Sequence, residues 1–317
     1  MMGTSERFSR LAMVFLTGLL VVTQPATART LNGFDLSGAG IPPDEIFRGG
    51  PPRDGIPALT DPDYIAAGEA SFLEDGDRVL GVEINGTPHA YPVGIMNHHE
   101  IVNHTSADSQ WLITYCPLCG TGMAFDATVG GSDLTFGVSG LLYNSDLLMY
   151  DRQTESLWSQ IEGRAVSGPL KGSELRLVSS RMTRWKAWRE AHPETRVLSR
   201  ETGHRRDYDR SPYGDYDDSA SVFFPVSERD DRYHPKAWTL GMTDGDSARA
   251  WPFEELEATG RATIRDQFNG RSLTIHYDAE NRSAHITDEK GETIPSTTGF
   301  WFAWYAFHPE TSVFTAD

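Results

Sequence analysis

The stretch Trp185-Lys-Ala-Trp188-Arg-Glu-Ala-His192-Pro-Glu-Thr-Arg-Val197 occurs twice in this 317-residue chain. It returns as Trp301-Phe-Ala-Trp304-Tyr-Ala-Phe-His308-Pro-Glu-Thr-Ser-Val313, with eight positions identical in the same frame. Tryptophans three residues apart share one face of a helix, which predicts that they pack in the core. The proline restricts the residue before it and predicts the end of that helix. The recurrence predicts a fold of two degenerate repeat units.

A second pair of matching segments lies upstream of the tryptophan motifs. Val79–Pro92 runs from a Leu-Gly strand through a turn to Ala-Tyr-Pro, and Thr239–Pro252 runs from Leu-Gly to Ala-Trp-Pro. The copies differ in length, since Gly81 to Trp185 is 104 residues and Gly241 to Trp301 is 60. Both cysteines lie in the longer copy. We therefore expect the first unit to carry the function and the second to be its structural partner; alternatively, both halves form one continuous sheet and share the work.

Other patterns predict many short strands and few helices. We expect a strand at Arg78–Ile84, a tight turn at Asn85-Gly86 and a return strand at His89–Val93. Helices are expected at 95–103 and at 183–191, the latter with Thr183 as its N-cap. Further strands are expected at 111–116, 123–126, 134–138, 147–150 and 174–178. Many strands with few crossover helices predict an α+β, mainly antiparallel β-rich fold.

The N-terminus has the pattern of an export signal. Arg7 and Arg10 precede the apolar stretch Leu11–Val22, and Ala26-Thr-Ala28 fits a cleavage site. The twelve residues of this stretch rise only about 18 Å as a helix, less than the roughly 30 Å of a bilayer core. We expect residues 1–28 to be a cleaved signal peptide, no stable membrane anchor after cleavage, and a periplasmic or secreted protein. The alternative is an uncleaved anchor.

The rest of the chain divides into an expected first unit at 29–200, a polar linker at 201–235 and a second, shorter unit at 236–317. The linker segment Arg205–Asp218 is rich in acidic and turn-forming residues, which predicts a solvated surface loop. The whole chain has a formal net charge of −17 at pH 7. Because such a surface repels phosphate backbones, nucleic acid is a poor partner. An unknown small molecule or an envelope protein is the expected partner.

The two cysteines concentrate the reactive chemistry. Both lie in Thr114-Tyr-Cys116-Pro-Leu-Cys119-Gly-Thr-Gly122, which has the C-P-x-C-G pattern of a metal-binding knuckle. A thioredoxin-type pair would open a helix, whereas glycines and a strand follow here. A bridge that closes so short a loop adds roughly 2 kcal/mol at most, so a structural disulfide explains the pair poorly. Metal ligation, a redox-active dithiol and inert thiols stay open as interpretations.

One knuckle supplies two ligands, and structural zinc needs four. Thiolate, imidazole and thioether ligands suit copper at least as well as zinc. We predict a copper or zinc centre in which Cys116, Cys119 and His99 are ligands, His98 is a further candidate ligand and Glu100 is an acid/base group. In the alternative, a thiol-disulfide redox protein, Cys116 attacks and Cys119 resolves; a third hypothesis is a non-catalytic binding module. The nearby candidates for the remaining ligands are His98, His99, His104, Met96 and Met123.

Two further polar motifs flank the knuckle. His99-Glu100-Ile-Val-Asn103-His104 nearly matches H-E-x-x-H, but Asn103 holds the place of the second histidine, which rules out the zinc-protease signature. Downstream, a polar cluster is predicted to bind a substrate or cofactor or to orient ligands, with local turn chemistry as the alternative. Its members are Asn144, Asp146, Asp151 and Arg152.

Together these motifs resemble the prokaryotic domain-of-unknown-function family 3179. The resemblance covers roughly Leu73 to Val313 and implies an exported or envelope protein, but no established activity. The position of His104 is usually acidic in that pattern, which makes His99, Glu100, Cys116 and Cys119 better site candidates. The matching segments are His99-Glu100-x-Val102-Asn103, Thr114–Gly120, Ser139–Leu141, Asp151–Gln160 and the helix from Trp185 to Pro193.

Overall fold

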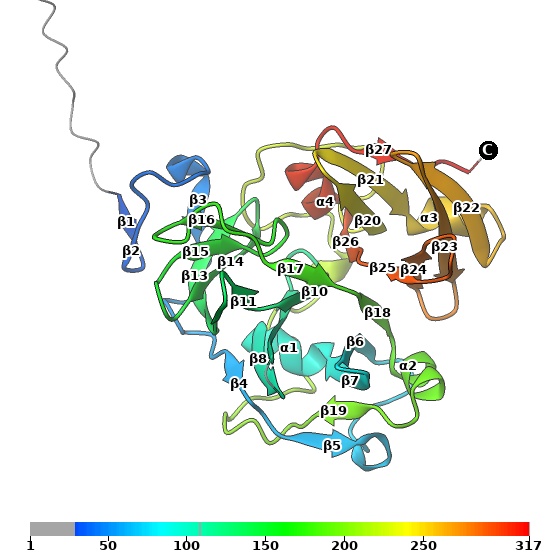
Figure 1. Ribbon diagram of the computed structural model, residues 1–317, viewed down its shortest axis with the longest axis horizontal. Coiled ribbons are helices and arrows are strands. Elements are labelled where there is room, and N and C mark those ends of the chain that lie inside the picture. The colour runs from blue at the N-terminus through cyan, green and yellow to red at the C-terminus, as the bar shows by residue number, and fades with distance from the viewer. Residues whose placement is uncertain (1–28, 108, 317) are drawn as a thin grey trace, which may run out of the picture.

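The computed structural model describes residues 29–107 and 109–316 (Figure 1). The expected signal peptide at 1–28 lies outside the described residues. The chain is rich in strands, most of them paired antiparallel, and has few short helices. The expected α+β, mainly antiparallel architecture is therefore confirmed. Within the described ranges, no helix combines the length and apolar character needed to cross a bilayer.

The helices are all short. They are α1 (Val93–His99), α2 (Trp185–Ala191), α3 (Phe253–Ala258) and α4 (Trp301–Phe307), with single 3-10 turns η1 (Pro43–Glu45), η2 (Ala67–Glu69) and η3 (Tyr216–Asp218).

The largest sheet has nine strands in the order β27-β21-β20-β26-β10-β9-β8-β4, with β17 beside β10. Because β26 pairs with both β20 and β10, this sheet runs through both sequence copies. It is the continuous sheet that the sequence left open as an alternative. Its strands are β4 (Leu59–Thr60), β8 (Ile101–Ser106), β9 (Ser109–Cys116), β10 (Thr121–Asp126), β17 (Arg176–Val178), β20 (Trp238–Asp244), β21 (Ser247–Pro252), β26 (Thr297–Phe300) and β27 (Ser312–Val313).

Smaller sheets surround the nine-stranded one, as Figure 1 shows. The order β18-β6-β7-β19-β5 joins β5 (Tyr64–Ala66), β6 (Arg78–Ile84), β7 (Thr87–Pro92), β18 (Ser180–Arg184) and β19 (Arg196–Leu198). The order β16-β15-β14-β13-β3 joins β3 (Ile46–Arg48), β13 (Phe136–Tyr143), β14 (Asp146–Asp151), β15 (Leu157–Ser159) and β16 (Arg164–Ser167). The remaining strands form β22 (Thr263–Phe268), β23 (Arg271–Asp278), β24 (Ser283–Thr287) and β25 (Thr293–Ile294), and the hairpins β1 (Thr30–Leu31) with β2 (Phe34–Asp35) and β11 (Thr128–Val129) with β12 (Ser132–Asp133).

The residues that recur in the sequence make matching contacts. A Cβ atom on Gly81 would lie 2.3 Å from the Trp188 ring, and one on Gly241 would lie 2.2 Å from the Trp304 ring. Only glycine lets the indoles pack this closely on β6 and β20. Each indole N–H also donates to a threonine hydroxyl seven residues on, at 2.9 Å in the first copy and 3.0 Å in the second. In both copies the chain then adds a parallel strand, β19 on β7 and β27 on β21.

Two predicted helix boundaries are wrong. The helix expected at 95–103 ends at His99, because Glu100 adopts a φ of 59° and the β-branched Ile101-Val102 enters β8. Thr183 is not an N-cap, since it lies in β18 opposite Val79 and the helix α2 starts after Arg184 without a side-chain cap.

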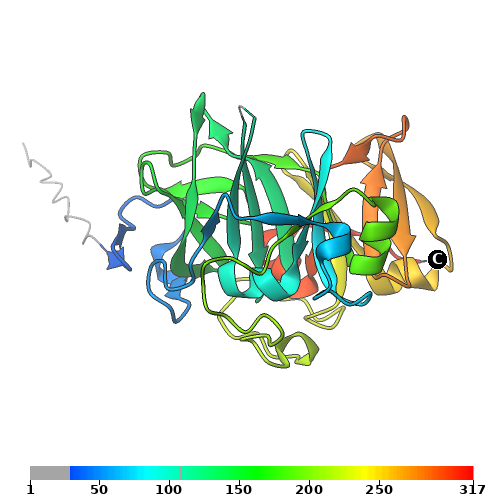
Figure 2. The same ribbon diagram turned by 90° about the horizontal axis from the view of Figure 1, so that it is seen from below.

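The predicted linker at 201–235 is more than a solvated loop. It forms no strand, but Tyr213, Tyr216 and Phe224 contribute to the core that also contains both cysteines. In Figure 2 the yellow-green segment lies beyond α1 and α4, on the same side of the strands. The acidic residues of this segment led to the prediction of a solvated loop. The aromatic side chains among them bury enough apolar surface to hold the segment against the core.

Candidate metal centre

A tight turn between β9 and β10 positions the two cysteines. Cys116 ends β9 and pairs with Thr121, the first residue of β10. The Cys119 N–H donates to the Cys116 carbonyl at 3.2 Å, and Gly120 follows with a φ of 62°. A side chain at Gly120 would meet the Phe300 ring at 3.0 Å, so glycine serves both the backbone angle and the packing. The predicted knuckle geometry, a turn rather than a helix, is confirmed.

A second tight turn, between β13 and β14, faces the knuckle. Tyr143 pairs with Asp146, and the two residues between them, Asn144 and Ser145, have φ angles of 50° and 66°. Two consecutive residues with positive φ form the type I′ turn that suits a two-residue hairpin. The Ser145 carbonyl oxygen accepts from the Cys119 thiol at 3.4 Å and from the Cys116 thiol at 4.0 Å. This contact between the turns brings Asp146 to the cysteines.

The resulting Cys-Cys-Asp cluster contains Cys116, Cys119 and Asp146, whose ligand atoms all lie within 4.8 Å of one another. The three residues are 2%, 0% and 1% exposed, and both cysteines are free thiols. Asp146 Oδ2 accepts from the Ile161 N–H at 3.2 Å, whereas its Oδ1 is buried without a hydrogen-bond partner among the described residues. The Ser145 hydroxyl oxygen is buried and unpartnered in the same way. Buried polar atoms normally have partners, so these two indicate a place for a ligand.

Burial favours the protonated form of each group in this cluster when no cation is present. Burial raises the pKa of Asp146 to about 7. It also raises the pKa of both cysteine thiols, and the negative charge of Asp146 raises the thiol pKa values in the same direction. Desolvation penalises the charged form of each group, and like charges at short range add to that cost. A bound divalent cation reverses both effects, since it favours the thiolates and the carboxylate.

Glu100 connects the cluster to an open pocket. It is buried at the end of α1, and Tyr213 donates its hydroxyl to Glu100 Oε1 at 3.1 Å. Burial, with a smaller contribution from the Asp146 charge, raises the pKa of Glu100 to about 7. Glu100 lines a pocket of 680 Å³ together with Leu118 of the knuckle and Leu147, the neighbour of Asp146. Glu100 therefore lines the pocket, and its charge also acts on Cys116 by raising the pKa of that thiol.

The rim of this pocket carries an exposed aromatic side chain. Phe223 lines the pocket and is 57% exposed, the large apolar side chain most open to solvent among the described residues. Most other lining residues are apolar, including Ile56, Val138 and Leu142. A concave, mainly apolar pocket with a few polar groups is typical of small-molecule sites.

The structure does not bring the two predicted histidine ligands into the Cys-Cys-Asp cluster. His99 Nδ1 lies 2.7 Å from the Pro57 carbonyl oxygen and its Nε2 lies 2.7 Å from the Tyr208 hydroxyl, so both ring nitrogens have protein partners. His98 lines the pocket, and its Nε2 lies 3.1 Å from the Arg210 carbonyl oxygen. His104, the weaker candidate, contacts the Tyr64 hydroxyl at 3.0 Å. A carboxylate takes the place beside the thiols where we expected an imidazole.

Of the predicted polar cluster, Asp146 alone joins the cysteines. Asn144 holds two distant segments together, since its amide donates to the Ala306 carbonyl at 3.2 Å and accepts from the Ser227 N–H at 2.8 Å. Arg152 donates to the Thr60 hydroxyl at 2.9 Å. These contacts join segments that are distant in the sequence, so they differ from the local turn chemistry that the sequence offered as the alternative.

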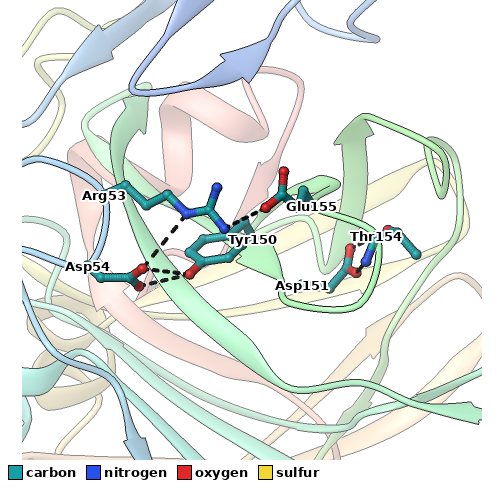
Figure 3. A network of polar contacts seen from close by, with 6 residues as sticks. All are labelled: Arg53, Asp54, Tyr150, Asp151, Thr154 and Glu155. Atoms are coloured by element: carbon teal, nitrogen blue, oxygen red, sulfur yellow. Dashed lines mark hydrogen bonds and ion pairs between the residues drawn. The ribbon is translucent and has the colours of Figure 1, made fainter.

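Asp151 serves a local turn. Its carboxylate accepts from the Thr154 N–H at 2.6 Å and from the Trp158 indole N–H at 2.9 Å. Figure 3 shows Asp151 beside Thr154, apart from a neighbouring network in which Arg53 lies against Tyr150 and reaches Glu155 at 2.8 Å. Asp151 thus stabilises the loop between β14 and β15 and points to no ligand of its own.

Sequence reasoning missed the contribution of the linker tyrosines. Tyr208 and Tyr213 position His99 and Glu100, and Tyr216 is buried in the core that contains the cysteines. These tyrosines lie in an acidic, turn-rich segment without helical or strand periodicity, so the sequence did not predict that they would be buried. The role of Asp146 had a faint indication, because an Asn-Ser pair between apolar strands is compatible with a tight hairpin turn.

Comparisons with known proteins give one finding. The family model described as "Protein of unknown function (DUF3179)" matches residues 53–311, a range that includes the knuckle, the β13–β14 turn and the helices α1 to α4. No curated protein and no solved structure matches the chain.

Proposed function

The chain belongs to the family of proteins of unknown function DUF3179, and we propose that its Cys116, Cys119 and Asp146 bind a divalent transition metal, with zinc as the ion that suits them best. The observation that carries the proposal is the convergence of two thiols and an unpartnered carboxylate oxygen in a buried place. Zinc accepts thiolate and carboxylate ligands together. A carboxylate in place of the expected imidazole or thioether moves the preference away from copper(I), which favours soft ligands.

The donor set favours a metal that acts on a small molecule. Three protein ligands leave the fourth position of a tetrahedral zinc ion open, as in zinc sites that bind water or substrate. The apolar pocket is lined by Leu118 and Leu147, which are the sequence neighbours of Cys119 and Asp146, and by Glu100. With a pKa near 7, Glu100 can accept or donate a proton at neutral pH. We infer a mainly apolar substrate that enters past Phe223.

The expected location outside the cytoplasm gives the metal a second role. Two neighbouring thiols in an oxidising compartment form a disulfide unless something protects them. Zinc bound to Cys116 and Cys119 would hold them as thiolates, and their burial limits access by oxidants. This part of the proposal depends on the export signal expected at residues 1–28.

Elemental analysis of the purified chain tests the metal proposal. We expect about one zinc per chain, and each of the variants Cys116→Ser, Cys119→Ser and Asp146→Asn should lose most of it. Asp126→Asn is the matched control, because Asp126 is a carboxylate on β10 that pairs with Arg176 at the surface. A native chain without metal after zinc and copper supplementation would reject the proposal, and copper in place of zinc would correct the identity of the ion.

A thiol-disulfide redox protein is the second candidate, and the short distance between the two sulfur atoms favours it. The raised pKa of both thiols disfavours it, because the thiolate is the reactive form. A count of free thiols distinguishes the two. The metal proposal predicts two thiols that become reactive when a chelator is added, whereas the redox alternative predicts a metal-free chain with a readily reducible bridge.

We also infer that the two tryptophan motifs belong to degenerate repeat units, of which the second supports the first. The matching Gly–Trp and Trp–Thr contacts support this inference, as does the absence of cysteine from the second unit. β10, which follows the knuckle, is hydrogen-bonded to β26, so the second unit flanks the site.

A further inference from the structure

A second concave site lies where the two sequence copies meet. It is a pocket of 260 Å³ between α2 and β18 on one side and β23 and β24 on the other. Figure 1 shows β18 beside β24. Both strands are distant in the sequence from the cysteine knuckle. The polar side chains that line the pocket are Arg181, Thr183, His276, Asp278, Ser283 and His285.

Nitrogen groups that can donate hydrogen bonds gather in this pocket: one guanidinium, and two imidazoles whose pKa values are lowered by burial. His276 and His285 lie directly opposite each other on β23 and β24, with their rings stacked at 4.5 Å and 12°. Arg181 makes no ion pair with any carboxylate in the described part of the chain. Asp278 is the acidic residue in the lining, and its oxygens accept from the Asn281 N–H at 3.1 Å and side-chain amide at 2.7 Å. The Arg181 guanidinium is therefore free of any ion pair within the described residues, and the carboxylate of the lining already accepts hydrogen bonds from Asn281.

We propose that this pocket binds a small tetrahedral oxyanion of the phosphate class, with Arg181 as the principal donor and His276, His285, Thr183 and Ser283 as further donors. The planar guanidinium of arginine places two N–H groups in line with two oxygens of such an anion. His276 Nε2 contacts the Thr287 hydroxyl at 3.0 Å, which leaves its other ring nitrogen for a ligand. The site is distinct from the Cys-Cys-Asp cluster and does not depend on the metal.

This donor-rich pocket contrasts with the negative net charge of the protein. The chain carries a formal charge of −17, so most of its surface repels anions. A pocket that gathers one guanidinium and two imidazoles is then a selective place for a negative ligand. Because the donors come from β18 in the first copy and from β23 and β24 in the second, a bound anion also ties the two copies together.

Calorimetric titration of the full chain with inorganic phosphate, sulfate and acetate at low ionic strength tests the proposal. We expect phosphate and sulfate to bind with similar affinity and acetate at least tenfold more weakly, since the two oxygens of acetate can satisfy the guanidinium but leave no oxygen for the imidazole and hydroxyl donors. Arg181→Gln should weaken phosphate binding at least tenfold. Arg189→Gln is the matched control and should change it less than twofold, because Arg189 lies on α2 outside the pocket and pairs with Asp75.

A measurement on the unaltered protein guards against a misfolded variant. Burial and the Arg181 charge lower the pKa of His285 to about 3, and the groups that face its ring from the packed strands are Arg181, His276 and Asp278. Bound phosphate favours the protonated ring, so proton NMR should show an upward shift of the His285 pKa, assigned with His285→Gln. No binding of phosphate to the native chain at millimolar concentration, an unchanged affinity in Arg181→Gln, or acetate binding as tightly as phosphate would each overturn the proposal.

Discussion

The two tryptophan motifs make matching contacts, and the chain builds different structures between the matching segments. In both, a glycine on the first strand of a hairpin accepts an indole ring, and that indole donates to a threonine seven residues on. In the first unit the chain then builds the knuckle and the turn that presents Asp146. In the second, the corresponding stretch builds β22 to β25, which contain no cysteine. The comparison teaches that the residues identical in both copies support the fold, whereas the residues of the site lie in the part that differs.

The largest effect is expected at the glycines under the tryptophans. Gly81→Ala and Gly241→Ala each place a Cβ within 2.3 Å of an indole carbon, so backbone or ring must move, at a cost of about 3 kcal/mol or more. Denaturant unfolding measures the loss. Gly68→Ala is the control, since nothing lies within 4 Å of the added atom. A large loss at one glycine and none at the other would break the equivalence of the units.

The next effect concerns Asp146 in metal-free protein. Burial raises its pKa in the folded state to about 7 from 3.8, so the stability that belongs to the protonated form is fully present below about pH 4 and is lost as pH rises through 7. Asp146→Asn removes this loss and should stabilise the metal-free chain at pH 8 by about 1–3 kcal/mol.

With zinc bound, the native chain should be more stable than Asp146→Asn, because the native carboxylate binds the metal and the amide of the variant does not. Unfolding curves with and without chelator measure both states. Asp126→Asn is the contrasting variant, since hydrogen bonds with Thr128 and Arg176 lower the pKa of that surface carboxyl. The substitution should therefore slightly destabilise the folded chain. Equal behaviour of the two variants would mean that the first unit holds no buried carboxylate site.

A smaller, paired effect is expected at the threonines that accept from the indoles. Thr195→Ala and Thr311→Ala each leave a buried N–H without its acceptor, at a cost of about 1–2 kcal/mol. Thermal or chemical unfolding measures both, and neither change should alter the zinc content. Loss of metal in Thr311→Ala would show that the second unit shares the work of the site.

The smallest effect on stability is expected at Phe223, at the rim of the pocket. Phe223→Ser removes an exposed ring and should change the free energy of unfolding by less than about 0.5 kcal/mol. It should nevertheless weaken the binding of an apolar fluorescent probe several-fold, because the ring lines the pocket. Unchanged probe binding would place the entrance elsewhere.

Local patterns predicted the parts of the fold that depend on neighbouring residues. The strand Arg78–Ile84 and the turn at Asn85-Gly86 appear as expected, since alternation and turn chemistry decide them. The strand at Ile101–Ser106 was missed because the expected helix at 95–103 extended into it, and long-range pairing with β9 and β4 decides the outcome. The C-P-x-C-G pattern likewise identified the knuckle.

The composition of the site could be predicted only in part. Cys116 and Cys119 are three positions apart in the sequence, so their pattern identified them without knowledge of the fold. Asp146 reaches them through the contact of two separate hairpin turns, and Tyr213 reaches Glu100 from the linker. No spacing rule relates such residues, because sheet packing rather than chain proximity brings them together.

X-ray absorption at the zinc edge of the chain as purified tests the central claim most directly, because it reports the atoms bound to the metal. We expect two sulfur neighbours at about 2.3 Å and lighter oxygen neighbours at about 2.0–2.2 Å, and the zinc signal should be mostly lost in Cys119→Ser. A spectrum with nitrogen and oxygen neighbours alone, unchanged by that substitution, would contradict that claim.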